Sequence, residues 1–149
     1  MTINGILSPT HLLQSGPALT AVPLVEAYIY LPLLNKGVTL QFLVDSGADM
    51  TVLHPQDSLR LLPRIEDWQA IDHYETKTVG GAGHGLPHKL VDAVVVFKHH
   101  DNSLDSESLT LWIALPNPQN LLQESLLGRD VLGAFVTRFD RMASFTLDR

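Results

Sequence analysis

The chain has 149 residues, enough for one domain with a hydrophobic core and too few for two domains of ordinary size. Apolar residues make up 45% of the chain and charged residues 17%, which is typical of a globular protein. The net charge of −6 with no basic run argues against a nucleic-acid partner, and the lack of cysteine excludes disulfides, thiolate metal sites and cysteine nucleophiles.

The N-terminal part of the sequence shows no sorting or membrane signal. Residues 1–15 lack the basic start and compact apolar core of a signal peptide. The most apolar stretch, residues 17–34, is interrupted by two prolines and a glutamate, whereas a membrane helix needs about 20 nearly uninterrupted apolar residues. We therefore expect a cytoplasmic protein with no membrane partner. Residues 1–16 are assigned to an N-terminal extension of unknown role, and residues 17–149 to the folded domain.

Most of the remaining chain is predicted to be extended. Residues 38–44 alternate so that Val38, Leu40, Phe42 and Val44 share one face, and Leu43 makes the other face apolar too, as in a strand buried on both sides. Other strands are expected at residues 19–31, 50–54, 70–78, 90–98 and 109–115, in a segment ending at 127, and in a closing hairpin at 135–148. Short helices are expected at 56–62 and 129–133, and a polar turn at 99–108. This pattern predicts an all-β fold, a small barrel or sandwich with one or two short helices.

Asp45 stands out because it ends the strand that is predicted to be buried, and Ser46 and Gly47 follow it directly. A carboxylate in such surroundings is unfavourable unless it is hydrogen-bonded or shares a proton. Gly47 would allow a tight turn that brings backbone N–H groups to the carboxylate. Asp-Ser-Gly alone is also common in surface turns. The apolar residues on both sides of the tripeptide favour the buried site over the surface turn.

A second segment, residues 125–132, combines an apolar strand end with Gly128, Arg129 and a predicted short helix. Between the two segments lies the glycine-rich stretch 79–85. In this order the three landmarks resemble the retropepsin family, and the layout is closest to its cellular bacterial members. The family has a hydrophobic-hydrophobic-Asp-Thr/Ser-Gly-Ala loop, a substrate-covering flap and a downstream Gly-Arg motif. The resemblance covers the chain from about residue 19 and implies a small closed β-barrel with aspartic endopeptidase activity, which makes the protein a hydrolase.

The resemblance also implies roles for individual residues. It assigns catalysis to the active-site loop, with Asp45 as the catalytic aspartate, Ser46 as the residue that braces the paired loops across a dimer, and Gly47. The residues implied to contact substrate are Ala48 and Asp49 in the loop and Gly80, Gly81, Ala82 and Gly83 at the flap tip. Gly128 and Arg129 are implied to give structural support, and we expect an intramolecular ion pair between Arg129 and Asp49 as their main role.

The sequence contains one Asp-Ser/Thr-Gly, so a peptidase that uses two carboxylates requires a second chain. A two-fold homodimer supplies the second Asp45 by symmetry. Two adjacent carboxyl groups share one proton, so that the ionised one can activate water while the protonated one polarises the scissile carbonyl of a peptide or protein substrate. This chemistry needs no cofactor and no metal.

Three alternatives remain open at this level. The chain could be a catalytically inactive retropepsin-fold module for dimerisation or peptide binding, because fold does not determine function. It could be an unrelated small β-barrel that binds a ligand. His84 and His88 could bind metal, but their glycine- and proline-rich segment lacks the helix of a His-x-x-x-His zinc motif. We therefore expect the seven histidines to be exposed to solvent.

Overall fold

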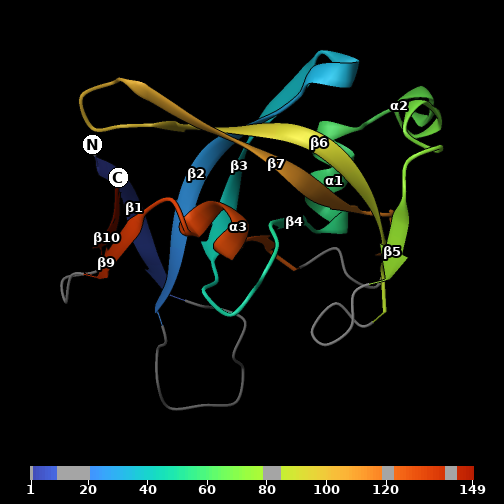
Figure 1. The fold of residues 1–149 in the computed structure, drawn as a ribbon. Helices are drawn as coiled ribbons and strands as arrows, with labels where there is room; N and C mark the ends of the chain where they lie inside the picture. Colours follow the sequence, from blue (N-terminus) through green and yellow to red (C-terminus); the bar gives the residue numbers. More distant parts are fainter. Residues whose placement is uncertain (1, 10–20, 79–84, 119–122, 140–143) are drawn as a thin grey trace.

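The computed structural model describes residues 2–9, 21–78, 85–118, 123–139 and 144–149. These residues form one ten-stranded sheet with three short α-helices and a 3-10 turn between β2 and β3 (Figure 1). The strands are β1 (Thr2–Pro9), β2 (Ala21–Leu31), β3 (Lys36–Val44), β4 (Val52–Leu53), β5 (Thr76–Thr78), β6 (Pro87–Lys98), β7 (Leu104–Ala114), β8 (Ser125–Leu127), β9 (Val136–Phe139) and β10 (Ser144–Asp148). The helices are α1 (Pro55–Leu61), α2 (Ile65–Ala70) and α3 (Arg129–Leu132), and the 3-10 turn η1 is Pro32–Leu34.

The sheet closes into a barrel. Its strands follow the order β5-β6-β7-β4-β8-β3-β2-β1-β10-β9. An additional pairing of β6 with β2 closes the stretch from β6 to β2 into a ring. In that pairing Tyr28 lies opposite Val96 and Tyr30 opposite Val94. The ring therefore runs through β2, β3, β8, β4, β7 and β6, which confirms the predicted all-β closed barrel. Most neighbours are antiparallel, but β3 runs parallel to β8 and β4 parallel to β7.

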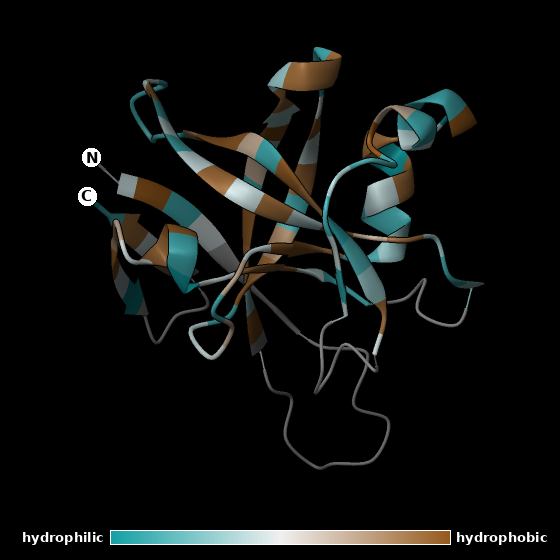
Figure 2. Ribbon diagram, turned by 45° about the vertical axis from the view of Figure 1, so that its right-hand side comes forward, coloured by the Kyte–Doolittle hydropathy of each residue, from teal (hydrophilic) through white to brown (hydrophobic). Residues whose placement is uncertain are grey.

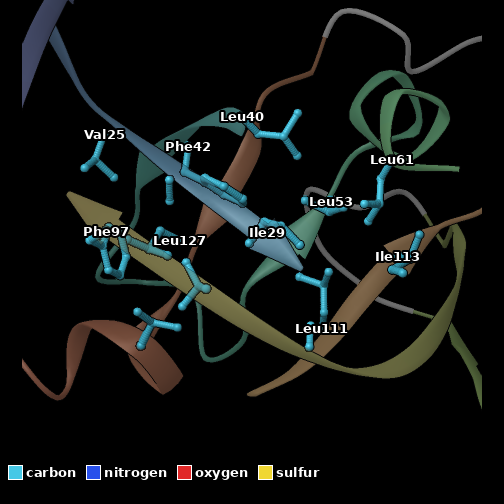
Figure 3. Packing of buried hydrophobic residues seen from close by; sticks show 14 of the residues in the cluster. Val25, Ile29, Leu40, Phe42, Leu53, Leu61, Phe97, Leu111, Ile113 and Leu127 are labelled. Carbon is cyan, nitrogen blue, oxygen red and sulfur yellow. The ribbon is translucent and has the colours of Figure 1, made fainter. Parts of the chain in front are cut away.

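Side chains alternate between the inside of the barrel and solvent along the long strands. Figure 2 shows this as bands of hydrophobic and hydrophilic residues, and along β6 buried residues alternate with more exposed ones. The inward side chains form one hydrophobic cluster that includes Ile29, Phe42, Leu53, Phe97 and Ile113, each at most 1% exposed (Figure 3). At about 25 cal/mol per Å² of buried apolar surface, this cluster is the main source of fold stability.

The first segment of the chain contributes β1 to the same sheet. Strand β1 pairs with β10, so that Thr2 lies opposite Asp148, and also with β2. The Thr2 hydroxyl donates a hydrogen bond of 2.6 Å to the Asp148 carboxylate, and Ile3 is buried in the core. The two ends of the chain consequently lie side by side (Figure 1).

The structure differs from the predicted elements in the middle of the chain. Helix α2 was not predicted; it is stabilised by Asp67, whose carboxylate accepts the backbone N–H of Arg64 at 3.1 Å, and by Trp68, whose indole N–H donates to the Leu62 carbonyl at 2.9 Å. The predicted strand 70–78 is reduced to β5, because residues 71–74 form a turn closed by the Tyr74 N–H and the Ile71 carbonyl at 3.0 Å. The predicted polar turn at 99–108 is shorter, because β7 already begins at residue 104.

No helix in the described part of the chain is long and apolar enough to cross a membrane.

Candidate active site

Asp45 lies where the chain leaves β3 at one end of the barrel. Strand β3 pairs in parallel with β8 up to the Val44–Leu127 pair, and the Asp45 N–H donates to the Leu127 carbonyl at 3.1 Å. Because Val44 is buried and Asp45 is half-exposed, the boundary of the core falls between these two residues. The carboxylate therefore emerges from a rigid strand at the barrel surface.

The loop after Asp45 turns tightly around the carboxylate. The Ala48 N–H donates to the Asp45 carbonyl at 3.1 Å, and the Gly47 N–H donates to the Asp45 carboxylate oxygen Oδ1 at 2.9 Å. A Cβ at Gly47 would lie 3.1 Å from this same oxygen, which is tight. Gly47 thus makes the backbone hydrogen bond expected from the sequence, while Ser46 is exposed beside it.

A second segment, residues 128–130, holds this loop through three consecutive backbone N–H groups. The Gly128 N–H donates to the Thr51 hydroxyl at 3.1 Å, the Arg129 N–H to the Ala48 carbonyl at 2.8 Å, and the Asp130 N–H to the Asp49 carbonyl at 3.2 Å. We call this segment the Gly-Arg-Asp clamp. Residue 128 must be glycine here, because a Cβ would lie only 2.4 Å from the carbonyl carbon and oxygen of Met50.

Thr51 and Asp130 complete the clamp, and the sequence reasoning missed both. The Asp130 carboxylate accepts the Thr51 N–H at 3.0 Å and the Thr51 hydroxyl at 2.7 Å. Thr51 is completely buried while Asp130 is exposed, so these charge-assisted bonds are partly shielded from water. The only available signal was the position of Asp130 directly after Gly-Arg, and that does not identify its partner.

Asp49 and Arg129 form the expected ion pair within one chain. Their side chains are 73% and 61% exposed, so solvent screens the pair and its contribution to stability is small. The backbone bonds of the clamp, rather than this ion pair, fix the geometry of the loop.

A hollow of about 300 Å³ adjoins the active-site loop on the side of β9. Ser46 and Arg129 line it together with small or apolar residues, namely Val44, Leu132, Gly133 and Thr137. Strand β9 lies at the edge of the sheet, paired with β10 on one side. The half-exposed carboxylate, the Ser46 hydroxyl and this hollow therefore occupy one face of the molecule.

The predicted flap tip, Gly80 to Gly83, lies outside the described residues. The described chain approaches it through β5 and β6, in which Thr78 lies opposite Pro87. Gly85 has a φ of +72°, a left-handed conformation that favours glycine.

The expectation that the histidines are exposed is wrong for three of them: His54, His88 and His99 are at most 7% exposed. His54 and His88 lie at a strand end and in a strand, where contacts with distant residues (the Ser125 hydroxyl and Ala114) hold them inside, whereas His99 lies in a hairpin turn closed by the local bond from its N–H to the Ser103 carbonyl. In the part of the chain that is described, no three His, Cys, Asp or Glu residues are grouped so that they could hold a metal ion.

No family model and no curated protein matches the sequence. Among solved structures, the fold is similar to that of a retropepsin-like aspartic protease from Rickettsia conorii, with a TM-score of 0.54 and 17% sequence identity. The match covers 99% of this chain and 91% of that chain. At this level of identity the similarity shows the fold, while the activity has to be argued from the site. The chain therefore has the fold of the retropepsin-like aspartic proteases.

Proposed function

We propose that the protein is an aspartic endopeptidase that acts as a homodimer, with one Asp45 from each subunit. The observation that carries the proposal is the placement of Asp45. Its carboxylate stands at the end of β3, a strand whose inner face is buried while its outer face, contrary to the expectation from the sequence, is not. It accepts the Gly47 N–H at 2.9 Å and lies in a loop that the Gly-Arg-Asp clamp holds in place. A fixed and partly exposed carboxylate is what a general acid or base requires.

The two-fold assembly supplies the second carboxylate. The single Asp-Ser/Thr-Gly provides one such group per chain, and a two-fold axis beside the loop brings a second one to the same place. The hollow that adjoins Ser46 is compatible with this arrangement, because it lies beside the loop and is lined mainly by small or apolar residues, of which Val44 and Leu132 are themselves nearly buried.

In the proposed reaction the two Asp45 carboxyl groups share one proton. The ionised group takes a proton from a water molecule, whose oxygen attacks the scissile carbonyl carbon, while the protonated group donates its proton to the carbonyl oxygen. The resulting tetrahedral diol then collapses: the protonated Asp45 gives its proton to the amine nitrogen, the C–N bond breaks, and the ionised Asp45 takes a proton from one diol hydroxyl as the new carbonyl forms, so that the pair again holds one proton. Both products are released without a covalent intermediate and without a metal.

The experiment that tests this proposal is cleavage of a mixed peptide library by the purified protein and by Asp45→Asn. We expect cleavage by the wild type and a loss of at least about a thousandfold in the variant, because the pair can no longer exchange its proton. Asp92→Asn is the matched control, since Asp92 is an exposed aspartate on β6 and should leave the rate unchanged. We also expect EDTA to leave the rate unchanged.

Two results would contradict the proposal. One is equal cleavage by the wild type and Asp45→Asn. The other is peptide binding without cleavage by a folded wild-type dimer, which would indicate a binding module instead. Sedimentation of the same samples gives the oligomeric state, and a fully active monomer would exclude the two-fold mechanism.

A further inference from the structure

Two buried imidazole rings and one partly buried indole ring lie near one another where β6 packs against the rest of the barrel. His54 follows β4 and precedes α1, His88 lies near the start of β6, and Trp112 lies in β7. His54 is 7% exposed and His88 1% exposed, and the rings of His88 and Trp112 have their centroids 6.3 Å apart. We call this cluster the histidine joint. It connects the β5–β6 pair to the segment between β4 and α1.

Each ring of the histidine joint has a polar atom without a hydrogen-bond partner among the described residues. The Nδ1 atom of His88 lies 2.8 Å from the Leu86 carbonyl, which can only accept, so Nδ1 carries the proton. The Nε2 atom of His88 is then an unprotonated acceptor, and it is buried without a partner, as are Nδ1 of His54 and the indole N–H of Trp112. A buried polar atom without a partner disfavours the closed arrangement.

The charged groups around the joint do not stabilise a protonated imidazole. From β5, Lys77 places its ammonium group 5.9 Å from the centre of the Trp112 ring. From β6, Lys89 faces residues 72–74, where its ammonium group donates to the carbonyls of Asp72 and Tyr74. Trp112 brings no charge from β7. The nearby carboxylates are already paired with these lysines, Glu75 with Lys77 at 3.3 Å and Asp72 with Lys89 at 3.9 Å, so the described residues on this side of the joint offer a protonated imidazole no free counter-charge.

Burial lowers the pKa of His54, and the Asp57 carboxylate in α1 is the negative charge that acts to raise it, but this carboxylate already has two other partners. It accepts the hydroxyl of Ser125, from β8, at 2.7 Å and lies 3.4 Å from the guanidinium group of Arg60. His54 itself is tied to β8 through its backbone N–H, which donates to the same hydroxyl at 3.1 Å. Because Asp57 is shared with Ser125 and Arg60, it gives little stabilisation to a protonated His54.

We propose that the histidine joint is a pH-sensitive switch that holds β5 and the start of β6 against the barrel while His54 and His88 are neutral, and releases them when these histidines take up protons. The switch does not depend on the proposed peptidase activity. It would give the fold a response to mild acid.

The direction of the response follows from where the protons bind. Burial lowers the pKa of His88 below its usual value, and burial together with the charge of His88 lowers the pKa of His54. In the released state both rings regain an ordinary pKa of about 6.5. The closed joint is therefore fully stable above that value, and it loses stability as the pH falls through it until the closed state also binds the protons.

The backbone held by the joint is short enough to open locally. Strand β5 has three residues, and in its pairing with β6 Lys77 lies opposite His88. The Leu90 N–H donates to the Glu75 carbonyl at 3.0 Å, and the Leu115 N–H donates to the Pro87 carbonyl at 3.0 Å. These two amides bracket the joint, so their exchange with solvent reports its opening.

The test is amide hydrogen exchange of Leu90 and Leu115 at pH 7.5 and 5.5, corrected for the intrinsic pH dependence of exchange. A histidine that binds its proton only in the open state raises the opening equilibrium by up to about tenfold over this range. We expect up to about a hundredfold in the wild type, up to about tenfold in His88→Phe or His54→Phe, and no increase in the double variant. His73→Phe, at an exposed histidine outside the joint, should behave like the wild type.

The result is decisive even if a variant does not fold, because the wild type alone has to show the acid-induced opening. Equal corrected exchange at both pH values in the wild type would overturn the switch. So would an increase that survives in the double variant, because another group would then be responsible.

Discussion

Replacing Gly128 with alanine would force a methyl group into the backbone of Met50. The added Cβ would lie 2.4 Å from the carbonyl carbon and oxygen of Met50 and 2.9 Å from its nitrogen. Because these are backbone atoms, no side-chain rotation can relieve the overlap, and either the loop or the clamp must move. The movement would break or lengthen the three hydrogen bonds that the backbone N–H groups of residues 128–130 donate.

The size of the effect follows from these contacts. Three hydrogen bonds at about 1 kcal/mol each, added to an overpacking penalty of about 1–3 kcal/mol, give an upper limit of about 6 kcal/mol. Partial relaxation should reduce this, and we predict a loss of about 3 kcal/mol in the free energy of unfolding. For a domain of this size that corresponds to a fall in Tm of about 6–12 °C. A shift of the Asp45 loop by about 1 Å should also lower kcat/KM by about a hundredfold.

Urea and thermal unfolding, both followed by circular dichroism at one protein concentration, measure the change in stability. Gly133→Ala is the matched control at the other end of α3, since its Cβ would meet one backbone atom, the Arg129 carbonyl oxygen at 3.0 Å, and we expect a loss below about 1 kcal/mol. If Gly128→Ala were as stable as the wild type, the clamp would not determine the position of the loop.

Two further predictions concern the clamp, and a third concerns the ion pair of Lys36 with Asp67 in α2. Arg129→Ala should cost less than about 1 kcal/mol in urea unfolding, because the ion pair is exposed and the backbone N–H remains; a loss comparable to that of Gly128→Ala would show that the side chain dominates. Thr51→Val should cost about 2–3 kcal/mol, because it removes a buried donor and acceptor, whereas Thr51→Ser keeps both and should retain most of the stability; equal losses would contradict this. Burial alone would raise the pKa of Asp67, but the hydrogen bond from Lys36 and the backbone N–H of Arg64 outweigh it and hold this pKa below its usual value. A double-mutant cycle of Lys36→Met and Asp67→Asn should therefore show a coupling of about 1 kcal/mol at pH 7 that is lost as the pH falls below about 3.8; a coupling that does not depend on pH would refute it.

The sequence predicted the parts of the structure that depend on short-range patterns. Alternation in residues 38–44 identified β3. The hydrogen bond from the Gly47 N–H to the Asp45 carboxylate was also predictable, because it lies within one turn. The all-β class followed from the pattern of short strands, and the closed barrel from the resemblance of three ordered landmarks to a known family; the comparison with solved structures confirms both.

The features that the sequence could not predict depend on contacts between distant segments. The Thr51–Asp130 bonds join residues 79 positions apart, and the pairing of β1 with β10 joins the two ends of the chain. His88 was judged by its glycine- and proline-rich segment, but its burial comes from pairing with β7. Helix α2 depends on the contact of Trp68 with the Leu62 carbonyl, which no apolar periodicity indicates.

The central claim is that the active centre consists of two Asp45 carboxyl groups from two chains. Wild-type and Asp45→Asn subunits, unfolded together in equal amounts and refolded at one total concentration, test it directly. If both carboxylates are needed, only dimers of two wild-type chains cleave peptide, so the activity should be about a quarter of that of an all-wild-type sample. A mixture that retains half of the activity would show that each chain acts alone and would contradict the account.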